Sequence, residues 1–176
     1  MARNVEIKAR IEYIERTRRL VAELSDRGPE TLQQTDTFFQ VDLGRLKLRE
    51  FGNGTAELIY YTRPNLPGPK ESQYQLAPVL AGSAMRKLLS RTLGVHGIVR
   101  KKRLVYWAGR TRVHLDEVEG LGNFLELEVV LTEQEPFESG VSEANRLLER
   151  LEIDTASLIP DAYIDLLRRD CLTAQT

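Results

Sequence analysis

Charged side chains recur at every second position in several short segments of the chain. Arg112, His114 and Asp116 alternate with apolar residues, and so do Glu126 and Glu128. In a β-strand, residues two apart project from the same face. One face of about six segments therefore carries long charged side chains, where small polar residues would be usual. Its basic members are Lys8, Arg10, Lys47, Arg49, Arg63, Lys101, Arg103 and Arg112, and its acidic members are Glu6, Glu57, Asp116, Glu126 and Glu128.

These faces would line the lumen if the strands closed into a barrel. A lumen lined by many basic side chains is expected to bind an anion, because unpaired buried charge is very costly. A few carboxylates among those cations indicate a divalent metal, since hard cations take oxygen ligands. A multivalent anion with a divalent metal is the chemistry of a polyphosphate. The alternative is an antiparallel sheet with one solvated face, which is the commoner arrangement for any single strand.

The hydrophobic spacing predicts the elements that must position these side chains. Strands are expected over residues 3–11, 34–42, 45–51, 55–63, 71–77, 98–108, 110–118 and 123–132. Helices are expected over 12–27, from Ser83 to Gly94, over 142–151 with Ser142 as its cap, and over 160–169, followed by a loose tail at 170–176. Short turns between the strands favour antiparallel pairing. We expect residues 1–176 to form one α+β domain, a closed eight-stranded antiparallel β-barrel with a charged lumen and amphipathic helices packed outside.

Composition excludes several classes of protein. The formal net charge is −1, from 25 basic and 26 acidic residues, and this balance argues against non-specific nucleic-acid binding. No apolar run approaches the length of a membrane span, and the first residues lack the apolar core of a secretory signal. A single cysteine, Cys171, permits no internal disulfide. We therefore expect a cytoplasmic protein without a membrane or nucleic-acid partner. The chain also lacks the P-loop, Rossmann and esterase-elbow motifs.

Short motifs follow one another along nearly the whole chain. They are Val5–Arg10, Gln34–Phe39, Gly44–Glu50, Ala56–Pro64, Lys101–Arg103, Arg112–Asp116 and Gly120–Glu128. In this order they resemble the CYTH-domain family, the triphosphate tunnel metalloenzymes, which include class IV adenylate cyclases and thiamine triphosphatases. The likeness is greatest to the bacterial class IV cyclase-like subgroup, through Gly120–Glu128 and the ending Pro160–Leu167.

The resemblance implies a role for each charged position. Glu6, Glu126 and Glu128 would hold Mg²⁺ or Mn²⁺, and the residues given catalytic roles are Glu6, Asp116 and Glu57. The triphosphate would be bound by Lys8, Arg10, Lys47, Arg49, Arg63, Lys101, Arg103 and Arg112. One position departs from the family's opening Glu-x-Glu-x-Lys motif, where Asn4 replaces the first glutamate. This change predicts a weakened metal site with one tight ion in place of two.

The resemblance implies an enzyme that converts ATP to cyclic AMP and pyrophosphate. One alternative is a triphosphatase acting on tripolyphosphate, thiamine triphosphate or a nucleoside triphosphate. Another is a non-catalytic polyphosphate binder, which Asn4 supports. The expected partners are such a small-molecule triphosphate and, as a homodimer, a second copy of the chain. A single-stranded nucleic-acid binder ranks last, because the interleaved carboxylates would repel a bare backbone.

Two further features are ambiguous in the sequence. His114 shares the phase of Arg112 and Asp116, so it could be a lumen acid or base, but a structural histidine is the commoner outcome. Tyr106 and Trp107 are one of several adjacent aromatic pairs. One member of such a pair should pack beneath a helix, and the other could stack on a base, although core packing is the favoured interpretation.

Overall fold

The computed structural model describes residues 1–173, and it describes side chains through Arg169. The strands are β1 (Ala2–Arg10), β2 (Arg27–Phe39), β3 (Arg45–Phe51), β4 (Ala56–Thr62), β5 (Lys70–Val79), β6 (Val95–Ala108), β7 (Thr111–Val118) and β8 (Gly122–Leu131). The helices are α1 (Ile14–Leu24), α2 (Gly82–Leu93), α3 (Phe137–Arg150) and α4 (Tyr163–Thr173), with a short 3₁₀ turn η1 at Thr155–Ser157. Among these elements, none is a helix of the length and apolar character needed to cross a membrane.

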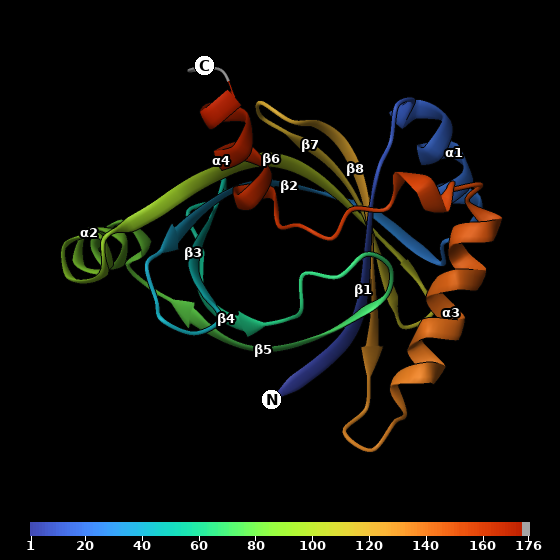
Figure 1. The fold of residues 1–176 in the computed structure, drawn as a ribbon, viewed down its shortest axis with the longest axis horizontal. Coiled ribbons are helices and arrows are strands. Elements are labelled where there is room, and N and C mark those ends of the chain that lie inside the picture. Colours follow the sequence, from blue (N-terminus) through green and yellow to red (C-terminus); the bar gives the residue numbers. More distant parts are fainter. Residues whose placement is uncertain (174–176) are drawn as a thin grey trace.

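The eight strands form a closed antiparallel barrel, as predicted, and their order in it is β1-β5-β4-β3-β2-β6-β7-β8 (Figure 1). The ring closes where β1 pairs with β8, a contact between the two ends of the strand sequence. In that pairing Glu6 lies opposite Glu128, and Lys8 lies opposite Glu126. The register therefore brings the acidic residues of the first and last strands together on the lumen side.

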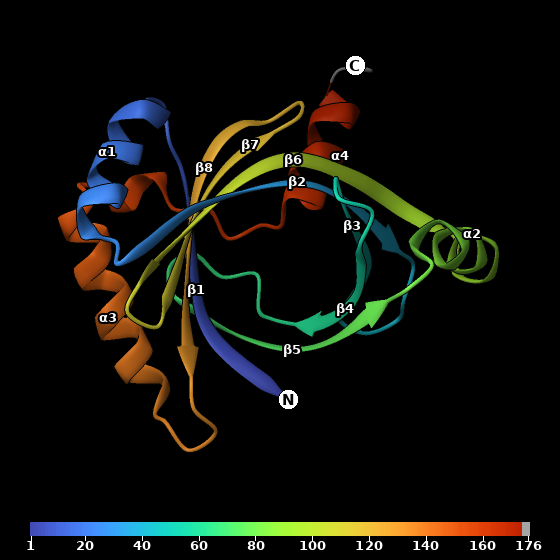
Figure 2. The same cartoon turned by 180° about the vertical axis from the view of Figure 1, so that it is seen from behind.

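The apolar faces of the strands point outward and are covered by helices. Val5 and Ile7 of β1 and Leu127 of β8 are buried beneath α1 and α3, which contribute Val21 and Leu147 to the same core. Figures 1 and 2 show α1 and α3 together on the β1, β7 and β8 side of the barrel, with α2 alone on the opposite side. Alternation thus separates an apolar outer layer from a charged lumen, because successive side chains of a strand point to opposite faces.

The last helix takes a different position. Residues 159–163 cross one end of the barrel, and α4 continues from them beside the start of β6 (Figure 1). Tyr163 and Ala162 pack on Phe124 and Val99 in a second, smaller core. The end of the barrel where β2 and β7 finish and β6 and β8 begin is therefore covered by the chain itself.

Several predicted boundaries were wrong. The strand β2 begins at Arg27, seven residues before the predicted start, because Gly28-Pro29 lies inside it as a bulge. The predicted serine caps are also absent: α2 begins after Ala81, and α3 begins after Pro136, so that Ser142 lies within the helix. Helix α4 continues to Thr173, into the segment expected to be a loose tail, and residues 174–176 of that segment lie outside the described residues.

Helix α3 approaches the barrel closely at Gly140. A Cβ atom there would lie 2.5 Å from Val5 Cγ2 and 2.9 Å from Leu131 Cδ2. We predict that Gly140→Ala lowers the free energy of unfolding by about 1–3 kcal/mol, because overpacking outweighs the gain in helix propensity. Urea unfolding checks this. Ser142→Ala, an exposed position on the same helix, is the matched control and should be neutral or slightly stabilising, and equal stabilities of both variants would contradict the close packing.

Candidate functional site

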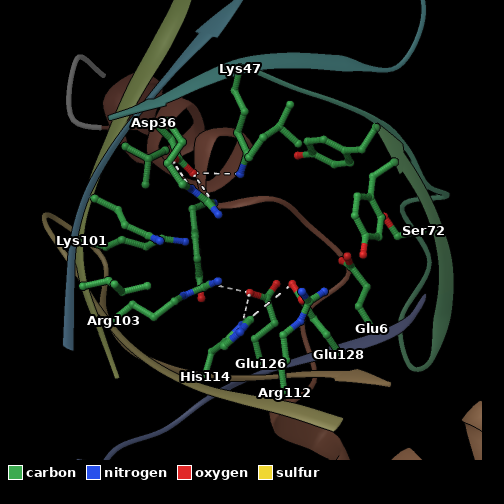
Figure 3. A pocket seen from close by; sticks show the side chains of 18 of the residues that line it. Glu6, Asp36, Lys47, Ser72, Lys101, Arg103, Arg112, His114, Glu126 and Glu128 are labelled. Atoms are coloured by element: carbon green, nitrogen blue, oxygen red, sulfur yellow. Dashed lines mark hydrogen bonds and ion pairs between the residues drawn. The ribbon is translucent and has the colours of Figure 1, made fainter. Parts of the chain in front are cut away.

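The lumen holds a cavity of about 330 Å³ whose walls are charged (Figure 3). This volume lies in the range of small-molecule sites. Among the described residues, the basic side chains that line it are Lys8, Lys47, Arg49, Arg63, Lys101, Arg103 and Arg112. The acidic ones are Glu6, Glu30, Asp36, Glu57, Glu126 and Glu128. The cavity therefore gathers most of the predicted site residues, but with seven basic and six acidic groups its charge is more balanced than the eight-to-five ratio of the predicted set.

Two predicted residues do not line the cavity. Arg10 is the last residue of β1, past the rim, where its guanidinium donates to Leu121 O and stacks on the Phe124 ring. Arg10 therefore does not face the cavity. Asp116 is completely buried behind Arg103 and does not line the cavity. Its position is that of a residue that orients a cation.

Arg103 is the centre of the first charge cluster. Its guanidinium donates two hydrogen bonds of 2.6 Å to Asp116 and a third of 2.6 Å to Glu126. Lys101 lies 3.4 Å from Asp116, which also accepts a 2.9 Å hydrogen bond from the Tyr163 hydroxyl. Burial would raise the pKa of Asp116, but Arg103 and Lys101 hold it below its usual value. The first cluster thus fixes the orientation of Arg103.

Asp36 organises the second cluster, on the adjoining part of the wall formed by β2 and β3 (Figure 3). Arg49 donates to both of its carboxylate oxygens at 2.8 and 2.9 Å, and Lys47 donates at 2.8 Å. Although burial opposes ionisation, Arg49 and Lys47 hold the pKa of Asp36 well below its usual range. Asp36 therefore stays ionised, and it directs two cations toward the same space that Arg103 and Lys101 face.

Three lysines hold their protons weakly. Burial and the nearby Arg103 lower the pKa of Lys101 to about 7. Burial and Arg49 lower that of Lys47 to about 8, and burial and Arg63 lower that of Lys70 to about 8. These amines are therefore partly uncharged near neutral pH, and an entering anion would favour their protonation.

One wall carries the group best suited to a metal ion. His114, Glu126 and Glu128 each place one ligand atom so that all three atoms lie within 4.8 Å of one another. Nδ1 of His114 is buried, lies 3.5 Å from Glu126 and 3.8 Å from Glu128, and forms no hydrogen bond. An unpartnered ring nitrogen among two carboxylates is a donor set that suits a divalent cation, above all Mn²⁺ and the later transition metals. The residues present therefore fit a metal ion.

Glu6, the third predicted metal ligand, lies beside this group and not within it. Its carboxylate forms a 3.0 Å ion pair with Arg63, and burial raises its pKa. Asn4, two residues earlier, also lines the cavity, so the position that departs from the family motif does face the lumen. Glu57, predicted as catalytic, lines the cavity near the start of β4, with Arg49 as its partner across the strands.

The sequence reasoning missed several residues that the structure brings to the lumen. Asp36, Gln34, Ser72 and Tyr163 line the cavity although no role in the site was predicted for them, and so does Tyr61, a member of another adjacent aromatic pair. The alternation that identified Lys47 and Arg49 also runs through Gln34 and Asp36, so it could have found them. Lys70 had no such signal, because it follows a proline-rich loop; its Nζ donates to the carbonyl oxygens of Leu66, Ile159 and Pro160.

Arg103 is hydrogen-bonded to two buried carboxylates, so its removal should cost stability even without a ligand. We predict that Arg103→Ala lowers the free energy of unfolding by about 3–5 kcal/mol, because Asp116 and Glu126 lose the buried cation that lies closest to both. Chemical denaturation of the ligand-free protein measures this. Arg100→Ala on the same strand is the control, since its side chain is 57% exposed and should matter little. A loss below 1 kcal/mol for Arg103→Ala would contradict this account of the cluster.

Several solved structures of other proteins are similar to this one. Similar solved structures include the PH1012 protein of Pyrococcus horikoshii OT3, with a TM-score of 0.84 and 25% identity over 93% of this chain and 98% of that one. A provisionally assigned adenylate cyclase of Vibrio parahaemolyticus has a TM-score of 0.77 and 19% identity, over 94% and 97% of the two chains. HpAC1 of Hippeastrum, provisionally an adenylyl cyclase but with a dominant triphosphatase activity, has a TM-score of 0.68 and 18% identity, over 95% and 96%.

At these identities the last two structures establish the fold alone. The comparison with curated protein sequences gives no match. The family comparison is decisive, because the model of the CYTH domain matches residues 2–163, nearly the whole chain, and so covers both charge clusters and the metal-binding group. The motifs, the barrel and this match agree, and the chain belongs to the CYTH domain family.

Proposed function

We propose that the protein is a divalent-metal-dependent enzyme that cleaves a phosphoanhydride bond of a triphosphate bound in the barrel lumen. The observation that carries the proposal is the combination of basic side chains with the His114, Glu126 and Glu128 group around one cavity. Arginine suits bidentate contact with phosphate, and lysine acts as a point charge.

Binding would exchange ion pairs that line the lumen. Glu126 is paired with Arg103 at 2.6 Å, and Glu128 is paired with Arg112 at 2.7 Å. Phosphate oxygens would draw the arginines away, and the released carboxylates would need another cation. Since the lumen has little excess positive charge, a metal ion bound with the triphosphate would supply the missing charge. His114, Glu126 and Glu128 would hold it, and the metal would stabilise negative charge on the phosphate oxygens.

We place the cyclase reaction first. Arg63 lines the cavity at the end covered by residues 159–163, so it is suited to the terminal phosphate. The α-phosphorus would then lie toward the other end. The ribose 3′-oxygen would bond to the α-phosphorus, the bond from that phosphorus to the bridging oxygen would break, and pyrophosphate would leave. The hydroxyl proton would pass to a carboxylate of the lumen.

A triphosphatase is the second candidate, because the same cations would also stabilise water attack at the terminal phosphorus. HpAC1, which shares the fold, has this activity as its dominant one. Incubation with ATP, tripolyphosphate or thiamine triphosphate, each with Mg²⁺ or Mn²⁺, separates the candidates. Cyclic AMP with pyrophosphate indicates the cyclase, and orthophosphate indicates the triphosphatase. Binding without turnover would leave only a polyphosphate binder.

Turnover should depend on the metal-binding wall. We predict that Glu126→Gln and Glu128→Gln each lower kcat by about a hundredfold or more, because each removes one charge from the metal site and keeps the shape of the side chain. Initial rates at saturating metal measure this, with the melting temperature as the test of folding. Glu117→Gln on the outer face of β7 is the control. Parental rates in both lumen variants would contradict the assignment.

Metal and triphosphate should bind interdependently. We predict that Mn²⁺ binds about tenfold or more tightly when tripolyphosphate is present, a coupling of ordinary size, because phosphate releases the carboxylates from Arg103 and Arg112. Calorimetry compares Mn²⁺ titrations with and without tripolyphosphate, and Glu126→Gln corrects for metal bound by the anion in solution. Equal affinities in the two titrations would show that the ion pairs do not exchange.

Triphosphate binding should take up protons. We predict that affinity falls as the pH rises through about 7 to 8, because Lys101 and Lys47 lose their charge in that range. The ligand-free protein should show the opposite trend. Its folded state binds fewer protons than the unfolded chain above pH 7, so the lysines make unfolding less favourable as the pH rises. Calorimetry at pH 7.5 in HEPES and in Tris measures the uptake, and identical heats in both buffers would refute it.

A further inference from the structure

The two ends of the cavity differ in chemistry. At the end away from α4, the cavity reaches solvent, since Glu30 and Leu76 line it and Leu76 is 48% exposed. The antiparallel order brings the late residues of β3, β5 and β6 and the early residues of β2 to this end. We call it the mouth, and its apolar and aromatic lining consists of Leu32, Phe51, Tyr74, Leu76, Val105 and Trp107.

The other end leaves no room for an organic group. There the carbonyl oxygen of Pro160 accepts hydrogen bonds from Arg63 and Lys70, and Tyr163 binds Asp116. Tyr163 is 6% exposed and Ala162 is 4% exposed, so this end is sealed by buried side chains. A triphosphate held by the lumen cations could therefore extend only toward the mouth.

We propose that the mouth is a stacking subsite for the base of a nucleoside triphosphate, with Trp107 as its platform. This inference rests on the proposed function, because a triphosphate in the lumen is what would bring an organic group to the mouth. Inorganic tripolyphosphate has no apolar surface to cover Leu76 and Trp107, whereas a base would cover them, and burial of apolar surface favours binding.

The surroundings of Trp107 suit that role. The guanidinium of Arg27 lies 3.7 Å from the centre of the indole ring, and Arg27 does not line the cavity. The ring therefore has one partner outside the cavity, which fixes its plane, while it contributes to the cavity wall. Arg112, the partner of Trp107 across the strands, places a positive charge beside the platform, where the α-phosphate would lie. A base on Trp107 and a phosphate near Arg112 are compatible with one bound nucleotide.

The chain has a single tryptophan, so its fluorescence reports on this subsite directly. We would titrate the protein, with Mg²⁺, with analogues of ATP and tripolyphosphate in which methylene groups replace both bridging oxygens, so that neither is cleaved. The ATP analogue should quench the fluorescence saturably and bind about tenfold more tightly than the tripolyphosphate analogue. Both Trp107 variants lack this fluorophore, so calorimetry measures their affinities. Trp107→Ala should lose the preference, and Trp107→Phe, which keeps a ring, should retain most of it.

The controls separate this inference from the proposed function. Tyr13→Ala removes an aromatic side chain that is 66% exposed and lies outside the cavity, and it should keep the parental preference. If both analogues bind the parent equally without quenching, or if Trp107→Ala keeps the preference, the stacking subsite is refuted while triphosphate binding stands. If neither analogue binds the parent, the proposed function fails, and this inference fails with it.

Discussion

The pairing of buried carboxylates with buried cations is the interaction on which the rest of the structure depends. Asp36 and Asp116 would be costly to bury alone, and so would Arg49 and Arg103. Together they form bidentate pairs on adjoining parts of the lumen wall, because β2 lies next to β6. These two aspartates let the barrel enclose a set of cations in the absence of any ligand. They also hold the guanidinium groups facing one cavity.

This compensation has a consequence for binding. A lumen whose charges already balance has no large reserve of attraction for a multivalent anion. The proposed triphosphate would therefore be recognised by an exchange of partners. Phosphate groups would replace the carboxylates that now pair with Arg103 and Arg112. A metal ion would replace the cations that now pair with Glu126 and Glu128. His114 contributes to this wall a ring nitrogen that has no hydrogen-bond partner. The same wall would then bind both the metal ion and the phosphate groups of a metal–triphosphate complex.

The two ends of the barrel differ in chemistry. Residues 159–163 bind lysine and arginine side chains with backbone carbonyls at one end, and they place Tyr163 against Lys8 and Lys101 through its ring. The mouth at the other end is lined by aliphatic and aromatic side chains. Strand direction produces this difference, because each strand contributes its charged middle to the centre and different ends to the two openings. A ligand with one charged and one apolar part matches such an axis.

The sequence by itself determined which residues face inward. A period of two specifies the face of a strand whatever the order of the strands, so Lys8, Lys47, Arg103 and Glu126 could be assigned to one surface before any pairing was known. The motifs then supplied the family and, with it, the closed barrel. The apolar outer layer followed from the same alternation.

Only the tertiary structure decided which of these residues meet. Arg10 has the right phase but lies past the rim, because phase says nothing of depth along the barrel axis. Asp116 has the right phase but lies behind Arg103, because phase does not say which side chain covers another. His114 joins Glu126 and Glu128 through the register of β7 and β8, which alternation does not specify. The ambiguity at Tyr106 and Trp107 was also resolved by face, with Tyr106 in the outer core and Trp107 in the cavity. Lys70 and the closure by residues 159–163 depend on contacts between segments far apart in the chain, and no local pattern carries that information.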